Sequence, residues 1–262
     1  MSSYKCYLIP SPIKSILFMK INTLAFAAHP DDAELSCVGT LLVEKRRGQS
    51  IGIIDLTQGE LGSRGSAEIR AKESTLSSEI LGLDIRENLK MEDGFFENNL
   101  SNKIKIIEVI RNYQPDIVLA NAPRDRHPDH GRGSQLVKEA CFLAGLSKII
   151  TQDKAGNSQK AWRPKKVFFY MQDFYLEPDF IIDISAVMDI KMKSILSYDT
   201  QFSGSNNEPL TYISSDSFLE SVKYRNRLIG KKIGVEYGEG FILAESHLGL
   251  PNFENIILPE IV

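Results

Sequence analysis

The chain has 262 residues, of which 42% are hydrophobic and 25% charged, so its composition is ordinary for a globular protein and its length suffices for one large α/β domain. Its 34 acidic and 31 basic side chains give a formal net charge of -3, which argues against a nucleic-acid binder that relies on bulk positive charge. No stretch approaches the roughly 20 apolar residues of a membrane span, and the three cysteines form no C-x-x-C motif, so we expect a cytoplasmic protein without disulfides.

The N-terminal segment 1–18 differs from the rest of the chain. Pro10 and Pro12 interrupt its apolar residues, so it lacks the hydrophobic region of a signal peptide. Met19 stands directly before the first predicted strand. We therefore expect residues 1–18 to be a dispensable arm, or not native if Met19 is the start, and residues 19–262 to form a single domain.

Apolar runs alternate with helical patterns along this domain. Continuous apolar runs are typical of strands covered on both faces, and apolar residues at every third or fourth position are typical of helices. The alternation predicts an α/β fold with a Rossmann-like, mostly parallel sheet and helices on both faces. The expected elements are strand 22–28, helix 33–47, strand 51–56, helix 67–81, strand 86–91, helix 102–113, strand 116–120, helix 133–144, strands 167–171 and 180–184, helices 187–198 and 218–233, and strand 241–244.

Four metal-capable side chains directly follow the first predicted strand. They are His29, Asp31, Asp32 and Glu34. Charged groups at the end of a buried strand are costly to hold unless a cation balances them. A metal ion is the simplest candidate for that cation.

A second cluster follows the predicted strand 116–120 and contains Asp125, His127, Asp129 and His130. Ligands of such sheets bind at the carboxyl ends of the strands, so we expect the two clusters to meet in one crevice. Two histidines and one carboxylate with an open fourth position form a catalytic zinc arrangement. The carboxylate and imidazole left over would then be candidates for general base and general acid.

Three segments of the sequence together resemble the LmbE/PIG-L family of zinc-dependent N-deacetylases. They are the run His29-Pro30-Asp31-Asp32-Ala33-Glu34, the glycine-rich loop from Gly59 to Gly65, and the run Arg126-His127-Pro128-Asp129-His130. Within the family the chain is most similar to the subgroup that deacetylates N-acetylglucosaminyl malate in bacillithiol biosynthesis, while other members act on chitobiose or mycothiol precursors. The resemblance implies an LmbE-like fold, a small N-acetyl glucosaminide as substrate, and a homo-oligomer, either a hexamer or a trimer.

The resemblance also implies a role for each residue of the two clusters. His29, Asp32 and His130 would bind Zn²⁺, with Fe²⁺ as the alternative metal. Asp31 would be the general base for attack of a zinc-bound hydroxide on the acetamide. His127, as an imidazolium, would stabilise the oxyanion or protonate the leaving amine.

Several side chains around the clusters are candidates for supporting roles. Asp129 could orient His127, as carboxylates near metal sites do. Arginines bind carboxylates in a bidentate manner, and the resemblance supports Arg70 and Arg126 as substrate clamps more than Arg64. Three tyrosines could donate a hydrogen bond to the oxyanion, and they are Tyr198, Tyr212 and Tyr237.

Each of these residues also has a purely structural interpretation. Asp31 and Asp129 could be helix N-caps, Glu34 could have only a structural role, and Arg64 could be a solvated loop charge. At the level of function, the alternatives are metal-assisted phosphoester cleavage, which usually needs two metals, and a non-catalytic sugar- or metal-binding module on the same fold.

Overall fold

The computed structural model describes residues 19–202, 209–245, 247–250 and 252. The expected N-terminal arm 1–18 therefore lies outside the described residues. Within the described part the core is a seven-stranded sheet in the order β3-β2-β1-β4-β5-β7-β6. Its strands are β1 (Thr23–Ala27), β2 (Ile51–Thr57), β3 (Ile85–Met91), β4 (Ile117–Ala120), β5 (Lys166–Tyr170), β6 (Phe180–Asp183) and β7 (Gly238–Leu243).

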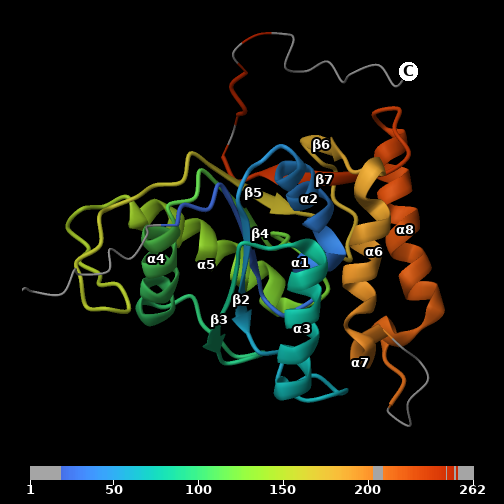
Figure 1. Ribbon diagram of the computed structural model, residues 1–262, viewed down its shortest axis with the longest axis horizontal. Helices are drawn as coiled ribbons and strands as arrows, with labels where there is room; N and C mark the ends of the chain where they lie inside the picture. The colour runs from blue at the N-terminus through green and yellow to red at the C-terminus, as the bar shows by residue number, and fades with distance from the viewer. Residues whose placement is uncertain (1–18, 203–208, 246, 251, 253–262) are drawn as a thin grey trace, which may run out of the picture.

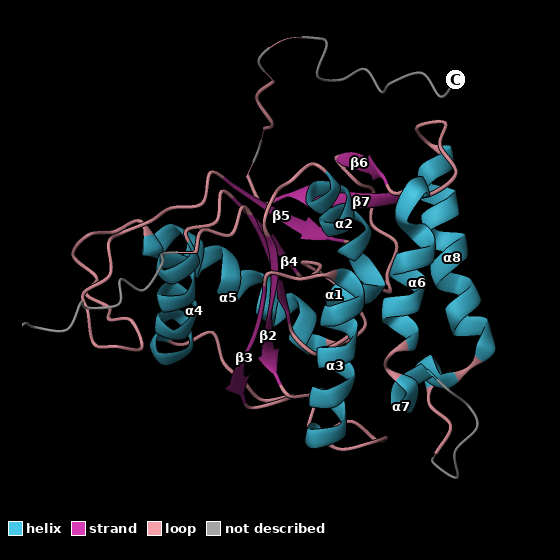
Figure 2. Ribbon diagram, viewed as in Figure 1, coloured by secondary structure: helices cyan, strands magenta, loops and turns pink. Residues whose placement is uncertain are grey.

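The pairing of the strands confirms the predicted fold class. Strands β1 to β5 pair in parallel with their neighbours, whereas β7 runs antiparallel to both β5 and β6. Helices flank the sheet on both faces, and α8 lies outermost on one side (Figures 1 and 2). The helices are α1 (Asp32–Ser36), α2 (Val38–Arg46), α3 (Ala67–Leu81), α4 (Leu100–Tyr113), α5 (Pro128–Ala144), α6 (Met188–Leu196), α7 (Asp199–Phe202) and α8 (Asp216–Lys231).

The apolar residues of β1 explain why the sheet is covered on both faces. Leu24 and Phe26 pack into the core that contains α4 and α5, whereas the alternate residues Ala25 and Ala27 pack into the core beneath α1, α2 and α6. A strand directs successive side chains to opposite faces, so a continuous apolar run supplies both cores. No helix within the described ranges is long and apolar enough to cross a membrane.

The predicted helix 33–47 is wrong in one respect, because the structure breaks it into α1 and α2 at Cys37. The first amides of α2 are bound by a side chain from β7. Glu239 accepts hydrogen bonds from the backbone N–H of Gly39 at 3.0 Å and of Thr40 at 2.7 Å. Lys191, which is fully buried like Glu239, lies 2.6 Å from the same carboxylate and balances its charge. The side chain that binds the first amides of α2 thus comes from a distant strand, which the local sequence does not reveal.

Replacing Glu239 with glutamine is expected to destabilise the protein by about 3–5 kcal/mol, because it leaves the buried charge of Lys191 without its partner. The free energy of unfolding from urea denaturation would measure this loss. Glu236→Gln is the matched control, since Glu236 pairs with Arg227 at an exposed site. Equal stability of the two variants would contradict the role assigned to this ion pair.

Candidate metal centre

A cavity of about 350 Å³ lies at the carboxyl ends of the parallel strands. His29 follows β1, the glycine-rich loop follows β2, and Asp93 follows β3. The second predicted cluster follows β4, and Gln172 follows β5. The expectation that the two clusters meet in one crevice is therefore confirmed, and the volume is typical of small-molecule sites.

The His29 ring is held by carboxylates on one side and faces Asp32 on the other. Its Nε2 lies 3.0 Å from Asp93 Oδ1 and 3.3 Å from Asp129 Oδ2. Its Nδ1 lies 3.5 Å from Asp32 Oδ2. Two carboxylates around Nε2 favour a proton on that nitrogen, which leaves Nδ1 with a free electron pair directed at Asp32.

His130, in the first turn of α5, repeats this arrangement from the opposite side. Its Nδ1 lies 2.6 Å from Asp125 Oδ2, and its Nε2 lies 3.1 Å from Asp32 Oδ1. The carboxylate of Asp125 favours a proton on Nδ1, so the electron pair of Nε2 also faces Asp32. Each histidine thus has a carboxylate behind it, as metal-binding histidines do.

The two distances from Asp32, one from each of its oxygens, are close to those between ligands of one metal ion. Nitrogen ligands bind zinc at 2.0–2.1 Å, so two ligand atoms of a tetrahedral site lie roughly 3.3 Å apart. The contacts of Asp32 with His29 and His130 are 3.5 Å and 3.1 Å. Among the described residues, the sets whose ligand atoms all lie within 4.8 Å of one another are different ones, namely His29 with His127 and His130, and His29 with Asp93 and Asp129.

The electrostatics of the site favour positive charge at its centre. Although burial opposes it, the neighbouring carboxylates raise the pKa of His29 well above its ordinary value and that of His130 to about 9. Burial also acts against the ionised form of Asp32, yet His130 and His29 hold its pKa well below the ordinary value. A divalent cation would meet the same demand for charge that protons meet here.

Asp31 adopts a strained backbone conformation at the entrance to α1. Its φ of 115° lies in the left-handed region, which costs of order 1–3 kcal/mol for a residue other than glycine. The side chain makes no capping hydrogen bond, so the interpretation of Asp31 as a side-chain cap is wrong. Burial raises its pKa to about 7, against the opposing effect of Arg70. A carboxyl group with a pKa near neutrality suits a general base.

The glycine-rich loop packs against the guanidinium of Arg70. Arg70 Nη1 donates to the Pro30 carbonyl at 3.1 Å and lies 3.4 Å from Asp31 Oδ2. A Cβ atom at Gly59, whose φ is +67°, would lie 3.0 Å from Arg70 Nη1, and a Cβ at Gly62 would lie 3.2 Å from Nη2. These glycines let the loop approach the arginine, which lines the cavity beside the predicted base.

The expected contact between the carboxylate of Asp129 and His127 is absent. That carboxylate is fully buried and instead contacts His29, the backbone N–H of Gly94 at 2.8 Å and Arg132 at 2.6 Å. The link to His127 runs through the backbone, because the N–H of Asp129 donates to His127 Nδ1 at 3.3 Å. Asp129 therefore orients the first histidine of the site, and His127 keeps Nε2 for other contacts.

The two remaining predicted clamps differ in position. Arg126 is exposed at the rim of the cavity, where it pairs with Asp173 at 3.3 Å and lies over the ring of Tyr212. Arg64 is buried, with 4% of its surface exposed, so the interpretation as a solvated charge is wrong. It is also missing from the described residues that line the cavity.

The three candidate tyrosines are likewise missing from the described lining of the cavity. Tyr198 is fully buried and donates to Glu34 Oε1 at 2.9 Å. Tyr212 donates to Asp173 at 3.0 Å, and the Tyr237 hydroxyl accepts from Arg227. The same carboxylate oxygen of Glu34 accepts from Arg86 at 2.6 Å, which gives Glu34 the structural role that was its alternative.

Sequence reasoning missed four residues of the site. Asp93 follows β3 just as the predicted clusters follow their strands, and that strand-end position is the signal that would have identified it. The amides of Asn121 and Gln172 contact Asp32, and Arg225 reaches the cavity from α8.

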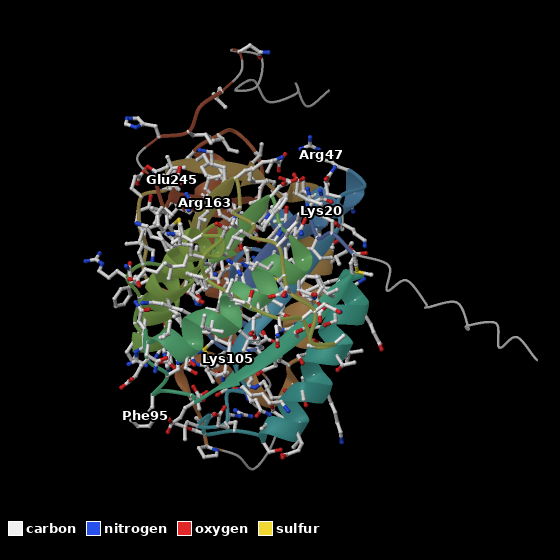
Figure 3. All side chains as sticks on the ribbon, turned by 90° about the vertical axis from the view of Figure 1, so that its left-hand side faces the viewer. Lys20, Arg47, Phe95, Lys105, Arg163 and Glu245 are labelled. Atoms are coloured by element: carbon white, nitrogen blue, oxygen red, sulfur yellow. The ribbon has the colours of Figure 1, made fainter. Side chains whose placement is uncertain are left out.

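Phe95 is the neighbour of Gly94, which lines the cavity, but its side chain points out to solvent, with 67% of its surface exposed (Figure 3).

The chain is similar in sequence and in fold to several known proteins. Residues 24–141 match the sequence model of a family described as PIG-L: GlcNAc-PI de-N-acetylase. The crystal structure of the conserved protein TT1542 from Thermus thermophilus is 37% identical, with a TM-score of 0.77, over 88% of this chain and 98% of that chain. A diacetylchitobiose deacetylase of Thermococcus kodakarensis is 28% identical over 73% of this chain and 77% of its own length. A Bacillus subtilis protein named "Probable N-acetyl-alpha-D-glucosaminyl L-malate deacetylase 2" is 23% identical over 73% of this chain and 92% of its own length.

Proposed function

The chain belongs to the PIG-L (LmbE) family of deacetylases, and we propose that it removes the acetyl group from an N-acetylglucosaminyl conjugate with the help of a bound metal ion. One observation carries the proposal. The Asp32 carboxylate lies between two histidines, His29 and His130, each backed by a carboxylate, and the strained Asp31 is its neighbour in the chain. This is a ligand set with a base beside it.

We assign His29, Asp32 and His130 as the residues that hold the metal, with zinc as the preferred ion and iron as the alternative. A divalent metal bound there would polarise the acetamide carbonyl and acidify an attacking water. Asp31 would accept the proton of that water. Burial gives this carboxyl a pKa of about 7, so it is substantially ionised at neutral pH and still basic enough to accept a proton.

His127 would act on the other side of the substrate carbonyl. Burial, together with repulsion from His29 and His130, lowers its pKa, so the ring is neutral at pH 7 and is not the imidazolium that the resemblance implies. Its Nδ1 accepts the backbone N–H of Asp129, which places the ring proton on Nε2. That N–H is available to donate a hydrogen bond to the oxyanion. The leaving amine would be protonated by the proton that Asp31 has taken from the water.

The substrate we favour is N-acetylglucosaminyl malate, with a chitobiose-type substrate as the alternative. Arg126 at the rim and Arg70 deeper in the cavity are the clamps we propose for the carboxylates of a malyl group. The Thermococcus kodakarensis relative is named for the chitobiose substrate, and the Bacillus subtilis relative is named for the malate conjugate. The strain and raised pKa of Asp31 argue against a non-catalytic binding module, because binding alone requires neither.

Acetate release from N-acetylglucosaminyl malate, diacetylchitobiose and N-acetylglucosamine tests this function directly. We expect turnover that a chelator abolishes and that added zinc restores, with the malate conjugate as the best substrate. Preference for diacetylchitobiose would select the alternative substrate. No acetate release from any N-acetyl sugar by the metal-loaded protein would overturn the proposal.

Replacing Arg70 with methionine is expected to shift the acidic limb of the pH–kcat profile to higher pH. The guanidinium lowers the pKa of Asp31, so its removal raises that pKa and the base becomes protonated at a higher pH. The rate of the variant therefore falls at a pH where the wild type is still active. Lys72→Met, an exposed change on the same helix, is the control, and an unshifted limb in Arg70→Met would show that Arg70 does not act on the base.

A further inference from the structure

Two buried amide side chains lie behind Asp32, on loops that follow neighbouring strands. Asn121 follows β4 and is fully buried, and Gln172 follows β5 and has 5% of its surface exposed. They are joined by a hydrogen bond, in which Asn121 Nδ2 donates to Gln172 Oε1 at 3.0 Å. We call these two residues the amide pair.

The backbone fixes which way each amide points. The N–H of Ala28, at the end of β1, donates to Asn121 Oδ1 at 2.9 Å. The N–H of Ala122 donates to Gln172 Oε1 at 3.1 Å. Since each amide oxygen is bound by a donor, both NH₂ groups must face the opposite direction, toward the site.

In that direction the amide pair reaches both oxygens of Asp32. Asn121 Nδ2 donates to Oδ2 at 3.1 Å, and Gln172 Nε2 donates to Oδ1 at 3.0 Å. Gln172 Nε2 also lies 3.3 Å from His130 Nε2, so one amide contacts two of the atoms assigned to the metal. The backbone N–H of His29 also donates to Oδ2, at 2.9 Å, so Gln172 supplies the amide donor to Oδ1 and Asn121 adds a second donor to Oδ2. The terminal torsion of an aspartate is soft, and donors to both oxygens fix a rotation that packing alone would leave broad.

We propose that the amide pair positions Asp32 for the metal and thereby sets the metal affinity of the site. The backbone of β1 and of the loop after β4 orients the two amides, and the amides orient the carboxylate. Gln172 additionally holds the spacing between Asp32 and His130. The inference rests on the proposed metal role of these two residues, and neither amide needs to contact substrate.

Two variants test the amide pair, Gln172→Met and Asn121→Leu, which keep an unbranched and a γ-branched side chain respectively and remove the donors. The dissociation constant of zinc is measured for each by competition with a chromophoric chelator, and the visible spectrum is recorded after loading with Co²⁺. We expect zinc binding to weaken by roughly 10- to 100-fold, which is typical when a residue that orients a ligand is lost. The Co²⁺ spectrum should change because the ligand geometry changes.

Asn226→Leu is the matched control. Asn226 is a buried amide that donates to the Gly238 carbonyl at 2.9 Å, and neither residue is among the described residues that line the cavity, so its loss should weaken the fold without altering zinc affinity. Wild-type zinc affinity in both test variants would overturn the proposal, as would failure of both to fold, because the amides would then be structural. Absence of zinc binding by the wild-type protein would instead overturn the proposed metal site itself.

Discussion

Asp31→Asn is expected to keep the metal and lower kcat by roughly 10²- to 10⁴-fold, the usual contribution of a general base. Asparagine has nearly the same shape and tolerates the left-handed conformation that Asp31 adopts, so the turn before α1 should persist. The amide cannot accept the proton of the attacking water. The variant should therefore lose turnover while its zinc content and thermal unfolding stay close to those of the wild type.

The pH profile adds a second criterion for the same variant. If the ionisation of Asp31 limits the wild-type rate on the acidic side, the residual rate of Asp31→Asn should lack that limb near pH 7. Turnover like that of the wild type would exclude Asp31 as the base. Loss of zinc together with turnover would instead place Asp31 among the ligands.

His130→Ala is expected to lose zinc and activity together. The change removes one of three proposed ligands and also leaves the buried carboxylate of Asp125 without its 2.6 Å partner. Metal content after gel filtration, and kcat with excess zinc, would measure the two losses. Full zinc occupancy in this variant would contradict the ligand assignment.

His127→Ala is the informative comparison, because His29, His127 and His130 form another possible ligand set. If Asp32 completes the site, this variant should retain zinc and show a lower kcat. If the three imidazoles hold the metal, zinc is lost instead. Zinc content in the two histidine variants thus shows whether His127 is a metal ligand, like His130, or acts on the substrate.

The sequence predicted the fold and the position of the site because both depend on local patterns. Apolar runs such as Leu24 to Ala27 read directly as buried strands, and charged residues at the ends of parallel strands must gather at one edge of the sheet. The break between α1 and α2 was not predictable in this way. The carboxylate that binds the first amides of α2 belongs to Glu239, which lies 200 positions from Gly39 in the chain.

The partners of individual side chains were also beyond local patterns. Asp129 was expected beside His127, its close neighbour in the chain, but its carboxylate contacts His29, 100 positions away. Tyr198 was a candidate for the cavity and is instead buried against Glu34, 164 positions away. Such contacts depend on how the helices dock on the sheet, and residue spacing does not encode that docking.

Two separate stretches of the chain line the cavity. We call the part formed by the histidines and carboxylates of the metal centre the floor, and the part formed by residues after 200 the far wall. The histidines and carboxylates of the floor come from residues 29–130, whereas Gln201, Ile213, Phe218 and Arg225 contribute from α7, α8 and the segment between them. The residues proposed for hydrolysis and the proposed clamps Arg70 and Arg126 therefore lie in the earlier part of the chain, and the later part completes the wall of the cavity. Mutations in the later part can reshape this wall while the residues proposed for hydrolysis stay as they are.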